Sequence, residues 1–112
     1  MTMPNRHNSA VEDQKITDYL LNPNHKDGAP KEKFFTMHGF SLQNIEVFRT
    51  ALLNHAINRD IAKQMTSPHG DKYVLICEVE TPDKRNPCIK SIWIINHGEV
   101  NPRLISAYPE KE

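Results

Sequence analysis

Apolar residues recur at helical spacing in the first half of the chain. Three segments show this spacing and are predicted to form helices: 12–21, 31–37 and 42–57. Pro30 suits the first turn of the second helix. The third pattern is the most regular, because four apolar residues follow at intervals of three or four: Ile45, Phe48, Leu52 and Ala56. This segment is therefore predicted to be the longest helix.

From residue 61 onward the pattern changes to alternation of apolar and polar positions. It predicts four short strands, over 61–66, 72–80, 88–96 and 104–108. The third strand has apolar residues in succession, Ile92–Ile95, which predicts a central strand covered on both faces. Helices first and strands after, joined by short turns, predict an α+β domain: N-terminal helices packed on one face of an antiparallel sheet of about four strands.

The chain is predicted to form one domain. Its 112 residues leave no room for a second core of ordinary size. Residues 1–10 are polar and show no periodicity, so we expect a loose N-terminal tail followed by a single α+β domain over 11–109.

Charge and cysteine content exclude several classes of protein. Fourteen basic residues balance fourteen acidic ones, and no segment is strongly charged, which argues against a tail that coats nucleic acid. Folding can still create a small basic patch. Cys77 and Cys88 lack the close spacing of a zinc ribbon or a redox motif, so we expect reduced thiols.

Targeting and cofactor signals are equally sparse. The N-terminus has no apolar core of the kind a signal peptide requires, and no apolar stretch approaches the ~20 residues that span a bilayer. We therefore expect a cytoplasmic protein without a membrane partner. The six histidines show no chelating spacing, and the four glycines are isolated, so we expect no metal, no phosphate loop and no cofactor.

Polar residues gather at the ends of the predicted strands: His69, Lys72, Arg103, Ser106 and Tyr108. Ser106 and Tyr108 alternate with Ala107, so both should project from one face of the last strand. RNA cleavage without a metal ion needs a base for the 2′-hydroxyl, an acid for the leaving 5′-oxygen and a cation for the phosphate. These residue types fit that chemistry. Ordinary solvated strand ends remain the alternative.

Several segments resemble a family of small bacterial domains that occur alone or at the C-terminal tips of secreted polymorphic toxins. The resemblance covers roughly residues 15–109 and rests on segments 18–25, 31–40, 69–74, 92–95 and 102–109. Helices before a sheet, and a last strand that ends in a hydroxyl residue followed by Ala-Tyr-Pro, are also similar to the barnase/EndoU/colicin/RelE-like superfamily of toxin ribonucleases.

The resemblance implies a toxin-like ribonuclease that cleaves RNA by transphosphorylation without a metal ion. Its catalytic candidates here are His69, Lys72, Arg103 and Ser106. Lys33 is the helix-side candidate for substrate binding, and Tyr108 is a second. An active toxin would also have an immunity-type protein partner, of acidic character. The competing hypothesis is a non-enzymatic protein-interaction domain, and the two differ in whether the four catalytic candidates converge within reach of one phosphate.

Overall fold

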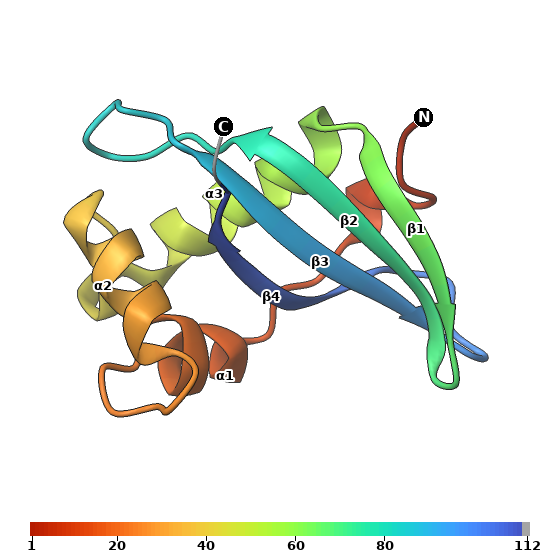
Figure 1. Cartoon of the computed structure of the whole chain (residues 1–112), viewed down its shortest axis with the longest axis horizontal. Helices are drawn as coiled ribbons and strands as arrows, with labels where there is room; N and C mark the ends of the chain where they lie inside the picture. Colours follow the sequence, from red (N-terminus) through yellow and green to blue (C-terminus); the bar gives the residue numbers. More distant parts are fainter. Residues whose placement is uncertain (111–112) are drawn as a thin grey trace.

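Helices precede a single sheet in the computed structural model, which describes residues 1–110 (Figure 1). The helical elements are η1 (Arg6–Asn8), α1 (Asp13–Lys15), η2 (Ile16–Leu20), α2 (Ala29–Met37), η3 (Leu42–Asn44) and α3 (Ile45–Asn58). The strands are β1 (Ile61–Ser67), β2 (Gly70–Glu78), β3 (Cys88–Asn96) and β4 (Arg103–Pro109). They form an antiparallel meander in the order β1-β2-β3-β4, so the predicted α+β architecture is confirmed.

One face of the sheet carries the core. Tyr73 pairs with Trp93 across β2 and β3, Trp93 pairs with Leu104 on β4, and all three side chains are buried. Figure 1 shows α3 behind the sheet and α1 and α2 to one side, beyond β4. The buried aromatic residues of the helical segments complete this core: Phe35, Phe40 and Phe48. Because the rings lie in mutual contact, α2 and α3 are fixed relative to each other.

The opposite face of the sheet has no helix in front of it in the described part of the chain (Figure 1). β3 is central, as predicted, but the expected cover on both faces is wrong, since Ile92 and Ile94 stay half-buried on the open side. Long neighbouring side chains such as Lys72, whose stem is aliphatic, can shield these residues in place of a helix. The run of apolar residues therefore predicted the central position of the strand correctly, but it did not indicate a layer of helices on the second face of the sheet.

The first predicted helix divides into two parts. α1 is a single turn, and η2 is a π-helical turn closed by a hydrogen bond from the Leu21 amide to the Ile16 carbonyl, at 2.9 Å. The Thr17 hydroxyl donates to the Asp13 carbonyl, a local bond that competes with the regular helical ladder. The wider turn buries Ile16 and Leu20 and leaves Tyr19 beside β4.

Residues 1–10 pack against the domain, in contrast to the loose tail expected from the sequence. Met3 is only 1% exposed. Ala10 exchanges backbone hydrogen bonds with Pro102 and Leu104 beside β4, and the Met1 carbonyl accepts one from Ile61 on β1. These bonds involve the backbone alone, and hydrophobic periodicity does not report them.

A buried histidine connects α3 to the sheet. His55 Nε2 donates to the Cys77 carbonyl at 2.9 Å, and this sets the tautomer, since a carbonyl can only accept. Nδ1 therefore accepts from the Ser91 hydroxyl at 2.8 Å, and Ser91 Oγ in turn accepts from Trp93 Nε1 at 2.8 Å. Each of these side-chain nitrogen and oxygen atoms therefore has a hydrogen-bond partner, as buried polar groups require.

Candidate functional site

Four of the six predicted site residues lie on the open face of the sheet. Lys72 and Arg103 share one cross-strand row with Ile94 between them, which places their backbones about 10 Å apart. Ser106 lies one row further, opposite Ile92, and Tyr108 follows on the same strand. The structure brings these residues to one face without gathering them around a single point.

The other two predicted residues lie elsewhere. His69 is in the exposed turn between β1 and β2, where its backbone carbonyl accepts a hydrogen bond from the His97 amide at 2.9 Å. Lys33 is exposed on α2, two residues from Lys31 and so on a different side of the helix. The four catalytic candidates therefore do not converge within reach of one phosphate.

Several outward positions of the open face carry basic side chains. Its outward positions on the four strands include four cations, which we call the cationic face: Lys63, Lys72, Lys90 and Arg103. The strand segments that carry them, 63–67, 72–76, 90–94 and 103–108, contain no Asp or Glu. The carboxylates that approach this face come from outside these segments.

Two of these cations already have carboxylate partners. Arg103 contacts Glu12 at 3.2 Å and Glu99 at 3.9 Å, and Lys90 contacts Glu110 at 3.0 Å. The hydrogen bond that Lys90 donates to the Glu110 carboxylate raises the pKa of Lys90 above its usual value. Lys63 and Lys72 take part in no ion pair within residues 1–110 and are available to an anionic ligand.

Tyrosines and lysines meet at the outer edge of β4. The Tyr19 hydroxyl and Ser106 Oγ are 3.0 Å apart. Lys31 Nζ lies 5.2 Å from the centre of the Tyr19 ring and 5.9 Å from that of Tyr108, so it sits between the two rings. We call this group the β4-edge cluster: Tyr19, Lys31, Ser106 and Tyr108. It joins η2, α2 and β4 at one place.

The turn before α2 holds the cluster in position. His25 Nδ1 accepts backbone hydrogen bonds from Asp27 and Gly28, each at 3.0 Å, and the ring stands edge-on to Tyr19 at 4.9 Å. With Nδ1 occupied as an acceptor, neutral His25 carries its proton on Nε2. His25 thus fixes the approach of α2 to Tyr19.

A concavity of about 300 Å³ adjoins the cluster. Tyr19, Lys15 and Arg103 contribute to its lining, together with Ile94 on the open face. Lys15 Nζ also lies 5.6 Å from the Tyr19 ring centre. A larger concavity, about 450 Å³, lies between α3 and the loop after β2, and none of the predicted site residues lines it. The 300 Å³ concavity is therefore the better candidate for a ligand site, because Arg103 and Tyr19 line it.

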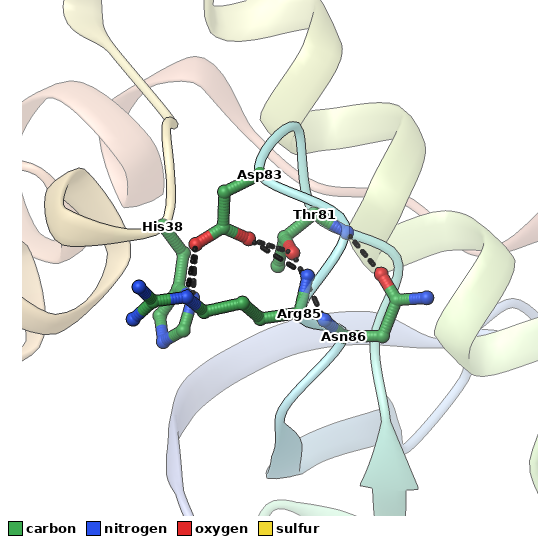
Figure 2. Close-up of polar contacts among 5 residues, drawn as sticks. All are labelled: His38, Thr81, Asp83, Arg85 and Asn86. Atoms are coloured by element: carbon green, nitrogen blue, oxygen red, sulfur yellow. Dashed lines mark hydrogen bonds and ion pairs between the residues drawn. The ribbon is translucent and has the colours of Figure 1, made fainter.

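A second polar network fixes the loop between β2 and β3 (Figure 2). His38 Nδ1 lies 2.9 Å from an Asp83 carboxylate oxygen, while Asp83 accepts from the Thr81 hydroxyl at 2.6 Å and from the Arg85 amide at 3.1 Å. The Thr81 hydrogen bond, with those from Arg85 and His38, holds the pKa of Asp83 below its usual value. This network ties the loop to the end of α2.

Tyr19 and Lys31 were not among the residues singled out in the sequence. Tyr19 belongs to an apolar helical stripe and suggested a core residue. A signal for Lys31 does exist: it precedes the buried Phe35 by four residues, which places it on the inward side of α2, whereas Lys33 does not share that spacing.

The sequence places the chain in a family. Residues 2–111 match the model of the domain of unknown function DUF6883, and the chain belongs to this family. One chain of the contact-dependent growth inhibition toxin–immunity protein complex from Klebsiella pneumoniae 342 has a similar fold, with a TM-score of 0.69. The two chains are 15% identical, and the match covers 89% of this chain and 98% of that one. A comparison with curated proteins found no match.

Within 1–110 no helix is long and apolar enough to cross a membrane. In the same part of the chain, no three His, Cys, Asp or Glu side chains are grouped so that they could hold a metal ion.

Proposed function

We propose that this chain is a toxin-type ribonuclease domain that cleaves RNA by transphosphorylation without a metal ion. The observation that carries the proposal is the set of four cations on the open sheet face, two of which, Lys63 and Lys72, have no carboxylate partner within residues 1–110. The fold shared with a chain of a toxin–immunity complex agrees with it.

The reaction suits the residue types at this face. The 2′-oxygen of RNA forms a bond to phosphorus, the bond from phosphorus to the 5′-oxygen breaks, and a 2′,3′-cyclic phosphate results. The 2′-hydroxyl loses one proton and the 5′-oxygen gains one, so no redox partner is needed. The pentacoordinate phosphate carries added negative charge, which lysine and arginine stabilise. Lys72 and Arg103 can also hold the neighbouring phosphates of the strand.

Purified protein incubated with total RNA and transfer RNA in EDTA should produce fragments that end in 2′,3′-cyclic phosphate. Ser106→Ala should reduce this cleavage, because it removes a hydroxyl from the face that binds RNA. His69→Ala measures whether the turn histidine takes part in proton transfer. Intact RNA throughout, together with undiminished toxicity of both variants in a host cell, would contradict the proposal.

The salt dependence of RNA binding provides a test that does not depend on cleavage. Each phosphate contact by a lysine releases counterions, so Lys72→Ala should reduce the slope of log K against log salt concentration by about one. Titration of a short single-stranded RNA at several salt concentrations measures the slope. Lys84→Ala is the matched control, since Lys84 is exposed on the loop after β2, outside the face. Equal slopes for the parent and Lys72→Ala would show that the face does not bind RNA.

A non-enzymatic interaction domain is the second candidate. It is favoured by one observation: the four catalytic candidates from the sequence do not converge, and Arg103 is paired with two carboxylates. An immunity-type inhibitor of acidic character would fit the cationic face in either case, because it would replace the phosphates of RNA. The cleavage assay in EDTA separates the two candidates.

A further inference from the structure

We infer that the β4-edge cluster holds the reacting phosphate, with Lys31 as its cation and the Tyr19–Ser106 hydroxyl pair as its hydrogen-bond donor. This inference rests on the proposed function and assigns the position of its catalytic centre. That centre lies at the edge of β4 and not in the middle of the cationic face. The lysine that α2 contributes to it is Lys31 and not Lys33.

The β4-edge cluster contains O–H and N–H donors that its own hydrogen bonds do not use. Tyr19 and Ser106 have two hydroxyl hydrogens between them, and the 3.0 Å contact uses one, so one donor remains. Lys31 Nζ donates to the Asp27 carbonyl at 2.8 Å, which uses one of three N–H groups. A phosphate oxygen can accept from the remaining donors without breaking a contact that holds the cluster together.

Lys31 is also the cation best placed to neutralise an anion at this edge. Arg103 and Lys90 are held by Glu12, Glu99 and Glu110. Lys31 has no carboxylate partner within residues 1–110. A phosphate bound there would form the ion pair that the described residues do not supply.

The tyrosine rings hold the ammonium in place. Lys31 lies over both rings, at 5.2 Å and 5.9 Å from their centres, so cation–π attraction to two rings fixes its position at the edge of β4. Tyr19 also borders the 300 Å³ concavity, which offers room for a neighbouring nucleotide beside the phosphate.

The test uses the full chain and a 2′-deoxy uridine–adenosine dinucleotide, which contains the phosphodiester and cannot undergo transphosphorylation. Calorimetric titration should show that Lys31→Ala weakens binding by about tenfold, the loss of one charge-assisted contact, while Lys31→Arg retains most of it. The double variant Tyr19→Phe/Ser106→Ala, which keeps the ring and removes both hydroxyls, should weaken binding several-fold, because either change alone leaves one hydroxyl donor. Lys26→Ala is the control, since Lys26 is exposed on the turn before α2.

Comparison of Lys31→Ala with Lys33→Ala tests which lysine of α2 binds the phosphate. The structure assigns this role to Lys31, whereas the resemblance implies Lys33. A larger loss for Lys33→Ala, equal affinity of the parent and Lys31→Ala, or no binding by the parent would overturn the inference. Circular dichroism confirms that each variant is folded.

Cleavage assays distinguish this inference from the proposed function. If the parent cleaves RNA and both Lys31→Ala and Tyr19→Phe/Ser106→Ala cleave it at the parental rate, the inference is overturned and the proposed function stands. If the parent binds the dinucleotide through Lys31 but cleaves no RNA, the phosphate site stands and the proposed function fails.

Discussion

Acidification from pH 7 to pH 4 is expected to lower the free energy of unfolding by about 3 kcal/mol through His55 alone. Burial lowers the pKa of His55 from 6.5 to about 4, and the nearby Arg59 adds to this, although the hydrogen bond to Cys77 opposes it. Between these values the unfolded chain binds a proton that the folded protein does not. Stability from His55 is therefore complete above pH 6.5 and falls as the pH drops toward 4.

Urea denaturation of the parent and of His55→Gln over this pH range measures the effect. Glutamine can donate to Cys77 and accept from Ser91 as His55 does, but it does not titrate. The charged groups near His55, including the carboxylates Glu78 and Glu80, are the same in both proteins, so their effects cancel in the difference. Asp83 has a lowered pKa, so its contribution is lost only below pH 3.8. Parallel curves for the two proteins would contradict the expected role of His55.

Gly28→Ala is expected to destabilise the protein by about 3 kcal/mol and to disturb the β4-edge cluster. A Cβ at position 28 would overlap the backbone carbonyl of Tyr19, which cannot move aside as a side chain could. The start of α2 would then separate from η2, and Lys31 would shift from Tyr19. Thermal unfolding and dinucleotide binding measure the two effects.

Gly98→Ala serves as the matched control for Gly28→Ala. Gly98 has a φ of 83°, but nothing lies within 4 Å of the added Cβ, so only backbone strain of about 1 kcal/mol is expected. If the two variants unfold at the same temperature, close approach of α2 to Tyr19 is not what holds this part of the molecule.

The sheet could be predicted in most respects because its strands are delimited by strong signals. β3 spans Cys88–Asn96, as expected, since Pro87 precedes it and His97-Gly98 turns the chain after it. α3 was predicted from its apolar stripe and begins after a short 3-10 turn. The position of residues 1–10 could not be predicted, because backbone hydrogen bonds and one buried methionine hold them.

The arrangement of the candidate site depends on an irregularity that the sequence does not reveal. Simple alternation would place Arg103 and Ser106 on opposite faces of β4. A register shift between Ile92 and Trp93 brings both to the open face, opposite Ile94 and Ile92. The spacing of Lys31 to Phe35 places Lys31 on the inward side of α2, but it does not show that Tyr19 and Tyr108 lie opposite. Candidate residues could therefore be chosen from the sequence, whereas the structure was needed to show which of them lie in contact.

The first ten residues also affect how the folded protein behaves toward other copies of itself. A sheet edge with free N–H and C=O groups is a template for pairing with another strand, which leads to aggregation. Ala10 forms a parallel bridge to Arg103 along β4, and Met1 occupies the amide of Ile61 at the start of β1. The N-terminal segment thus caps part of both edges, and its removal would expose them. We therefore expect removal of this segment to promote aggregation as well as to lower stability.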